Sequence, residues 1–163
     1  MITGFEGIFN YFLENKDRLK VMHVASCDQK SNPNSAPKML MDIQAPNKVF
    51  FLDYQSTKSY AFLQQNPKLS LSFMDDAAFQ GYRLTGIGKA LEPGEEYGAV
   101  KKEWDQRLIR YETDRILNRM NGHYSAKVAE MALPPNFIII KFTAEEGSLV
   151  EPGRVLRVYR KHK

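Results

Sequence analysis

The stretch of sequence that decides the fold is FFLDYQSTK at residues 50–58, continued by SYAFLQQNPKLSL at residues 59–71. It predicts a buried strand, a short polar turn, a brief helix and a second strand. The turn places the hydroxyls of Ser56 and Thr57 and the ammonium group of Lys58 where the helix begins. The first N–H groups of a helix have no internal partner and carry partial positive charge, so this position favours a phosphate. The same residues also suit a simple helix cap, and both interpretations stay open here.

Alternating and apolar runs on both sides of this stretch predict antiparallel strands. The expected strands cover residues 21–27, 35–43, 49–52, 68–74, 82–91, 137–142 and 154–160. Apolar residues at helical spacing near the start predict an N-terminal helix, and the period changes to 3.6 over residues 95–132. Short strands with few helices favour a small barrel, formed by a single domain over residues 1–163.

Composition and charge exclude several classes of function. The net charge of +4 arises from a basic stretch at residues 154–163, which we expect to be solvated or to contact a second subunit, with no nucleic acid as partner. The single Cys27 excludes an intrachain disulfide and predicts a reducing, cytoplasmic location. No apolar run suits a membrane span or a signal peptide. The three histidines lack ligand spacing, so we expect no metal site.

Pro37 is unusual inside an expected strand, because proline cannot donate a hydrogen bond to a neighbouring strand. It therefore indicates an edge or a bulge beside Lys38. Protection of an edge strand from aggregation would explain Pro37 equally well.

Four segments carry a resemblance to a known family. They are Asn34-Ser35-Ala36-Pro37-Lys38, Phe50–Asp53 with Ser56-Thr57-Lys58, Asn66-Pro67-Lys68-Leu69-Ser70-Leu71, and Gly81-Tyr82-Arg83-Leu84-Thr85-Gly86. In this order they resemble the FMN-binding split-barrel family of the pyridoxamine 5'-phosphate oxidase type. The resemblance implies a mainly β split barrel with Greek-key topology, six to seven antiparallel strands, an N-terminal helix and the helical insert. It further implies a homodimer with FMN in clefts shared between the subunits.

The resemblance also implies which residues bind the cofactor. Ser56, Thr57 and Lys58 would hold the FMN phosphate. Two strands would lie along the isoalloxazine ring or the ribityl chain, with Pro37, Lys38 and Met39 on one and Leu52 and Asp53 on the other. Gln80 and Tyr82 would reach the ring from a third strand. A cation such as Lys38 near the ring would favour flavin reduction. No residue is identified as catalytic.

The function implied is an FMN-dependent oxidoreductase acting on an unknown small substrate through a two-electron flavin cycle. The alternatives are a non-catalytic FMN-binding electron carrier or redox-responsive dimer, or a split barrel that uses deazaflavin or haem. The C-terminal end and the stretch 95–132 depart from the oxidase itself, so we expect no useful oxidation of pyridoxamine phosphate. If Tyr82 faces the cleft, Arg83 faces away from it.

Overall fold

The structure, a computed structural model, describes residues 4–120, 136–151, 153 and 157–160. Within these residues the chain forms three helices and seven strands. In chain order they are α1 (Gly4–Glu14), β1 (Val21–Cys27), β2 (Pro33–Gln44), β3 (Lys48–Tyr54), α2 (Lys58–Gln65), β4 (Lys68–Asp75), β5 (Gln80–Ala90), α3 (Glu95–Met120), β6 (Phe137–Val150) and β7 (Arg157–Arg160).

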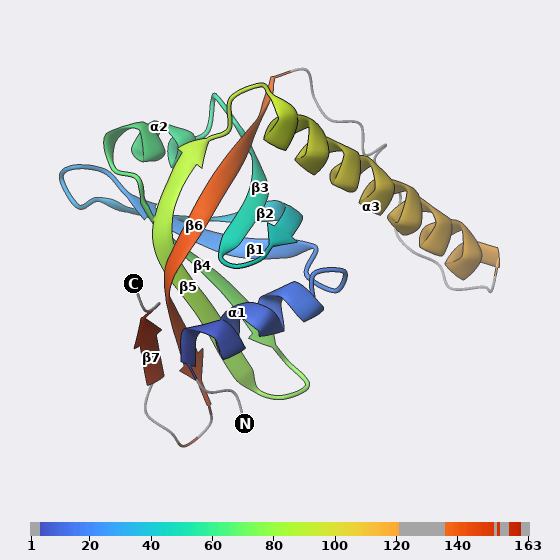
Figure 1. The fold of residues 1–163 in the computed structure, drawn as a ribbon, viewed down its shortest axis with the longest axis horizontal. Helices are drawn as coiled ribbons and strands as arrows, with labels where there is room; N and C mark the ends of the chain where they lie inside the picture. Colours follow the sequence, from blue (N-terminus) through green and yellow to red (C-terminus); the bar gives the residue numbers. More distant parts are fainter. Residues whose placement is uncertain (1–3, 121–135, 152, 154–156, 161–163) are drawn as a thin grey trace.

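Six strands form a closed antiparallel barrel (Figure 1). Their order is β3-β2-β1-β4-β5-β6, and a further pairing between β3 and β6 closes the ring. The neighbours β3-β2-β1-β4 form a Greek key. β7 pairs with β6 as an extra strand. The predicted mainly β barrel is therefore confirmed, together with its N-terminal and later helices.

Alternation along the strands fills the barrel with apolar side chains. In β1, Met22 and Val24 point inward and are almost completely buried, whereas Val21 and His23 face outward. α1 packs against this interior through the apolar face that its sequence predicts, with Phe5, Ile8, Phe9 and Phe12. α1 and α2 lie at opposite ends of the barrel (Figure 1). The two helices therefore leave much of the outer sheet face uncovered.

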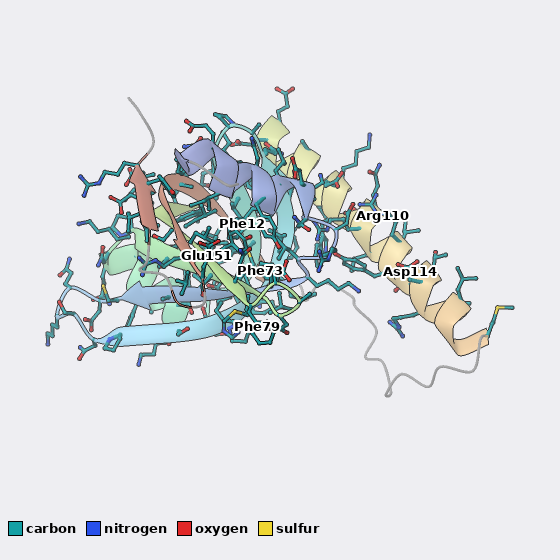
Figure 2. The ribbon with its side chains drawn as sticks, turned by 90° about the horizontal axis from the view of Figure 1, so that it is seen from below. Phe12, Phe73, Phe79, Arg110, Asp114 and Glu151 are labelled. Atoms are coloured by element: carbon teal, nitrogen blue, oxygen red, sulfur yellow. The ribbon has the colours of Figure 1, made fainter. Side chains whose placement is uncertain are left out.

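α3 covers one outer patch of the barrel and then extends beyond it. Trp104 packs there against Leu52 in a second apolar cluster. The fully buried Arg107 donates from Nη2 to the backbone carbonyls of Lys16 at 2.8 Å and Leu19 at 3.2 Å, which anchors the helix next to α1. The half of α3 that carries Arg110 and Asp114 projects away from the strands (Figure 2). The helical insert predicted at 95–132 is confirmed up to Met120, and 121–132 lie outside the described residues.

Close packing explains the glycines of β5. A Cβ atom at Gly86 would lie 2.0 Å from the carbonyl oxygen of Thr143 on β6, so no larger residue fits without a shift of the backbone. The register between β5 and β6 shifts at this point, between Thr85 and Gly86. A close backbone approach at a register shift is a common reason for glycine inside a strand.

Most strand predictions differ from the structure in length: β3, for example, covers Lys48–Tyr54 where 49–52 is predicted. The strand predicted at 137–142 continues to Val150, and β2 is longer at both ends than predicted. β7 is described only over Arg157–Arg160 of the strand predicted at 154–160.

Candidate functional site

Asp53, near the end of β3, is the centre of a buried polar cluster. Lys38 Nζ lies 2.5 Å from its Oδ1 atom, and the side chains of Lys38 and Asp53 are only 7% and 2% exposed. The same oxygen accepts hydrogen bonds from the Thr57 hydroxyl at 2.7 Å and from the backbone N–H of Tyr54 at 2.8 Å. A buried charge is stable only with such partners. The cluster therefore fixes the turn between β3 and α2.

Thr57 is the N-cap of α2. Its side-chain oxygen accepts a hydrogen bond from the backbone N–H of Tyr60 at 3.1 Å, while its hydroxyl donates to Asp53. Both polar functions of this side chain are thus used inside the chain. A phosphate at this turn would meet Ser56, Lys58 and the backbone N–H groups instead.

Ser56 and Lys58 are exposed beside this cap. Lys58 Nζ lies 5.1 Å from the centroid of the Phe62 ring, and it forms no ion pair within 4.0 Å in the part of the chain that the structure describes. The nearby carboxylate of Asp53 is neutralised by Lys38. The start of α2 therefore presents positive charge to solvent. Asp28 lies near enough to interact with it: hydrogen bonds from Asn32 are the main cause that lowers the pKa of this carboxyl, and the charge of Lys58 lowers it further.

Asn34 ties the first turn of α2 to the barrel. Its Nδ2 atom donates to Ser59 Oγ at 3.0 Å and to Ser26 Oγ at 3.3 Å. These contacts join α2 to β2 and β1, so the helix start is held by these two strands and by the Asp53 cluster.

Gln80 and Tyr82 belong to a different cluster. The Tyr82 ring is 2% exposed and stacks on Tyr11 of α1, with centroids 3.9 Å apart and planes inclined by 8°. Its hydroxyl donates to Gln80 Oε1 at 2.7 Å, and Gln80 Nε2 donates to Glu151 Oε1 at 3.0 Å. Tyr82 therefore faces the barrel interior at the α1 end, away from the start of α2.

Hydrogen bonding and burial shift the pKa values of this cluster. Burial raises the pKa of Tyr82 and, together with a hydrogen bond to Asp75, that of Tyr11. The hydrogen bond from the Tyr11 hydroxyl to Asp75 lowers the pKa of that carboxyl. Both tyrosines are thus neutral donors and Asp75 is an ionised acceptor at neutral pH.

The remaining predicted residues lie on the outer side of the barrel. Pro37 is exposed and pairs with His23 on β1. Met39 and Leu52 pack in the second apolar cluster with Trp104 of α3. The structure therefore brings Lys38, Asp53, Ser56, Thr57 and Lys58 together, and it separates them from Met39 with Leu52 and from Gln80 with Tyr82.

Arg83 is a candidate that the sequence analysis places only opposite Tyr82, facing away from the cleft. Because Tyr82 points inward, Arg83 points outward, into a hollow of about 480 Å³ in the outer sheet face. The hollow is lined by His23, Ser72, Phe73, Met74, Gly81, Tyr82, Arg83 and Val150. The period-two pattern could have indicated this, because Tyr82 and Leu84 share one face as an apolar pair and leave Arg83 with Thr85 on the other.

Comparison with known proteins identifies the family to which the chain belongs. Residues 10–151 match the family model described as pyridoxamine 5'-phosphate oxidase. The chain belongs to the pyridoxamine 5'-phosphate oxidase family. The resemblance predicted from the four sequence segments is thus confirmed.

A curated member of the pyridoxamine 5'-phosphate oxidase family aligns with this chain. It is a pyridoxine/pyridoxamine 5'-phosphate oxidase from Colwellia psychrerythraea, 29% identical over 131 residues, which cover 72% of this chain and 58% of the relative. The chain therefore matches less than two thirds of that relative's length.

Solved structures of related proteins share the fold. A protein of the pyridoxinephosphate oxidase family from Clostridium acetobutylicum superposes with a TM-score of 0.61 at 22% identity, covering 92% of this chain and 94% of that one. A pyridoxamine 5'-phosphate oxidase-related, FMN-binding protein from Nostoc punctiforme gives 0.60 at 12% identity, covering 99% and 93%. A heme binding protein from Mycobacterium smegmatis gives 0.59 at 14% identity, covering 86% and 52%. Members of this fold thus include proteins named for two different cofactors.

No group of three or more histidine, cysteine, aspartate or glutamate side chains among the described residues is placed to hold a metal ion. Of the helices described, none has the length and apolarity needed to cross a membrane.

Proposed function

We propose that this protein binds FMN and acts as an FMN-dependent oxidoreductase on a small substrate. The observation that carries the proposal is the start of α2, where Ser56 and Lys58 are exposed beside a carboxylate that is already neutralised. A flavin phosphate is a dianion and is bound well by a cation with hydroxyl and backbone donors. These donors match that group.

Asp53 decides whether an anion can bind at this turn. A free carboxylate within a few ångströms would repel a phosphate, but Asp53 is buried against Lys38 and accepts two further hydrogen bonds. The Lys38–Asp53 pair is neutral as a whole. Lys38 therefore favours flavin reduction less than the unpaired cation that the sequence alone suggests.

Each part of the chain would have a limited task in this function. FMN, when bound, supplies two-electron redox chemistry, and the protein binds and orients it. Ser56, Lys58 and the backbone of α2 would hold the phosphate. Pro37 and the neighbouring outer sheet face would lie toward the rest of the cofactor. We further propose that two subunits share each site, as the family resemblance implies.

A second candidate function is haem binding. His23 is exposed in the outer hollow, which Met74 and Val150 also line, so an imidazole lies beside apolar side chains that could contact a porphyrin. The related fold of the heme binding protein from Mycobacterium smegmatis supports this candidate. A non-catalytic FMN carrier differs from the oxidoreductase only in turnover.

Titration of the purified, cofactor-free protein separates these functions. We expect FMN to bind at one site per chain with quenching of its fluorescence, and riboflavin to bind more weakly. Titration with haemin should give no Soret shift that depends on His23. Saturable haem binding that is lost in His23→Ala, without any FMN binding, would overturn the proposal in favour of the second candidate. Turnover of nicotinamide donors with excess FMN distinguishes an enzyme from a carrier.

A further inference from the structure

We infer that Tyr11 and Tyr82 form a one-electron donor pair, which gives an electron to an oxidant at the outer sheet face while the phenolic proton of Tyr11 moves to Asp75. The pair uses none of the residues at the start of α2. The inference rests on the stacking of the two rings, on the different acceptors of their hydroxyls and on the place of Tyr82 in the barrel wall.

The two rings form one stacked unit inside the barrel end that α1 covers. Their centroids lie 3.9 Å apart, their planes are inclined by 8°, and Tyr82 is 2% exposed. Phe12 packs edge-on against Tyr82, with centroids 6.4 Å apart and planes at 90°. The π-systems of close parallel rings overlap, so an electron removed from Tyr82 is readily replaced from Tyr11.

The two hydroxyls have acceptors of very different basicity. Tyr11 donates to Oδ2 of the Asp75 carboxylate, whereas Tyr82 donates to the amide oxygen of Gln80 at 2.7 Å. A carboxylate can take up a proton, and an amide oxygen serves only as a hydrogen-bond acceptor. A phenol that has lost an electron is a far stronger acid than a carboxylic acid. The oxidised state therefore settles on Tyr11, as a neutral radical beside a neutral carboxyl group.

The carboxylate of Asp75 is able to accept that proton. Its Oδ1 atom accepts a hydrogen bond from the backbone N–H of Ala78 at 3.2 Å, and no ammonium or guanidinium group of the described residues lies within 4.0 Å of it. The hydrogen bond from Tyr11 lowers the pKa of Asp75, and burial raises the pKa of Tyr11, so the proton stays on the tyrosine until an electron leaves. Because Asp75 is only half-buried, it can pass the proton on to water.

The backbone of β5 connects the pair with the outer sheet face. The ring of Tyr82 points inward, and the same residue borders the outer hollow on the other side of the strand. An oxidant on the outer face is thus separated from the ring by the thickness of one strand, across which electrons tunnel without contact. The step is balanced: Tyr11 loses one electron and one proton, the oxidant gains the electron through Tyr82, and Asp75 gains the proton.

The class of oxidant follows from the chemistry of the donor. A phenol is difficult to oxidise, so the oxidant must be a radical or an aromatic molecule excited by light. The isoalloxazine of FMN belongs to the second group, and its assignment as the oxidant rests on the proposed function. The donor pair itself does not.

Flash oxidation of the FMN-free protein tests the pair without flavin. Tris(bipyridine)ruthenium(III), generated by a laser flash in the presence of persulfate, removes single electrons from tyrosine, and electron paramagnetic resonance detects the radical. We expect a long-lived tyrosyl radical in the wild type, most of which Tyr11→Phe removes. Tyr97→Phe is the matched control, because Tyr97 is also half-buried and stacks on Phe137 with centroids 6.4 Å apart, and it should keep the signal.

Two further readouts test the proton transfer. Asp75→Asn keeps an acceptor for the Tyr11 hydroxyl but removes the base, so the radical should decay several-fold faster. In the wild type the radical should form more slowly in D₂O than in H₂O, a readout that needs no variant. Equal losses in Tyr11→Phe and Tyr97→Phe, an unchanged lifetime in Asp75→Asn, or equal rates in the two solvents would each overturn the inference. Circular dichroism of each variant checks that the fold is kept.

The fluorescence lifetime of bound FMN tests the assignment of the oxidant. It should lengthen in Tyr82→Phe, whose ring cannot donate an electron, and stay unchanged in Tyr97→Phe. An unchanged lifetime in Tyr82→Phe would overturn that assignment. Titration of the cofactor-free protein measures FMN binding separately, so failure of the proposed function is distinguished from failure of the donor pair.

Discussion

At the scale of single residues, Lys38 has a structural task that decides what the neighbouring turn can bind. Its ammonium group satisfies Asp53 deep in the barrel wall, and Thr57 completes the same cluster. The side chains of Thr57, which caps the helix, and of Lys38, which neutralises Asp53, are therefore both used in contacts within the chain. Of the three residues predicted to hold the phosphate, Ser56 and Lys58 are exposed for an incoming anion.

Removing Lys38 tests this division of tasks. Lys38→Met leaves the Asp53 carboxylate buried without its cation, so we expect the free energy of unfolding to fall by about 3–5 kcal/mol. The double variant Lys38→Met/Asp53→Leu removes both charges and should recover most of that loss. Urea unfolding measures the free energy of unfolding of the single and the double variant. Lys48→Met, which affects a half-exposed pair with Glu96, is the control and should lose no more than about 1 kcal/mol.

Lys58 is tested by comparing FMN with riboflavin, which lacks the phosphate. We expect Lys58→Ala to weaken FMN binding by about 1.5–3 kcal/mol, because one charge-assisted contact is lost. Riboflavin affinity should change far less. Lys89→Ala removes an exposed cation on β5 and serves as the control. Equal losses for both ligands would show that Lys58 acts through folding rather than through the phosphate.

At the scale of helices and strands, alternation of apolar residues is sufficient to predict most of the fold. β1 has the bounds that its sequence predicts, and the apolar face of α1 packs against the barrel interior as expected. β6 is longer than predicted because residues 143–150 include Glu145, Glu146 and Gly147, which do not look like a buried strand. They pair because β5 and β7 lie on both sides of them.

The candidate site was less predictable than the fold. The turn residues Ser56 to Lys58 come together because they are adjacent in sequence. Whether Tyr82 or Arg83 points outward depends on which face α1 covers, and Tyr11, which stacks on Tyr82, lies 71 positions earlier in the chain. The pairing of Lys38 with Asp53 likewise depends on contacts between strands. The expectation that pyridoxamine phosphate is not oxidised relied in part on Tyr82 facing the cleft, and that part is wrong because Tyr82 is buried against Tyr11.

The attachment of α3 to the barrel should depend on pH. Glu96 in its first turn accepts hydrogen bonds from Lys141 on β6, at 2.8 Å, and from Lys48 on β3, at 3.1 Å. The hydrogen bond from Lys141 is the main cause that lowers the pKa of Glu96 below its ordinary value of 4.5. A carboxyl with a lowered pKa in the folded state stabilises the protein above pH 4.5 and loses that contribution as the pH falls below it.

The measurement is the melting temperature between pH 6 and pH 3.5. We expect Glu96→Gln to lower it at pH 6 and to make less difference at pH 3.5, because below pH 4.5 the carboxyl of the unfolded chain is mostly protonated and the ionic contribution to stability falls. Glu95→Gln, one position earlier in the same helix turn, is the matched control. A Glu96→Gln deficit that is as large at pH 3.5 as at pH 6 would contradict the ionic role of this contact.

At the scale of the whole molecule, exposed apolar side chains lie on two surfaces. One is the projecting half of α3, with Ile109, Ile116, Leu117 and Met120. The other is the outer sheet face with its adjoining loop, where Val21, Met74, Phe79 and Val150 are exposed. Contiguous apolar surface of this kind is unusual for a protein that stays a monomer.

We therefore predict a homodimer. Light scattering at micromolar concentration should give twice the mass of the chain, and Ile116→Lys with Met120→Lys should shift the mass toward that of one chain if the projecting helix contributes to the interface. Lys101→Glu, on the part of α3 next to the barrel, is a control that should leave the mass unchanged. A wild-type protein with the mass of a single chain, with FMN bound, would refute the shared-site arrangement.

The pairing of β3 with β6 sets the order in which the molecule can be completed during synthesis. Lys48 pairs with Thr143 and Tyr54 with Phe137, so the two strands that close the barrel lie more than eighty positions apart in the sequence. A growing chain released only as far as α3 exposes the unpaired edge of β3, whose side chains are Val49, Phe50, Phe51 and Leu52. Such an edge invites pairing with other chains, and closure over a long sequence separation is slow. The nascent protein therefore needs protection of this edge, by the ribosome or a chaperone, until β6 has emerged.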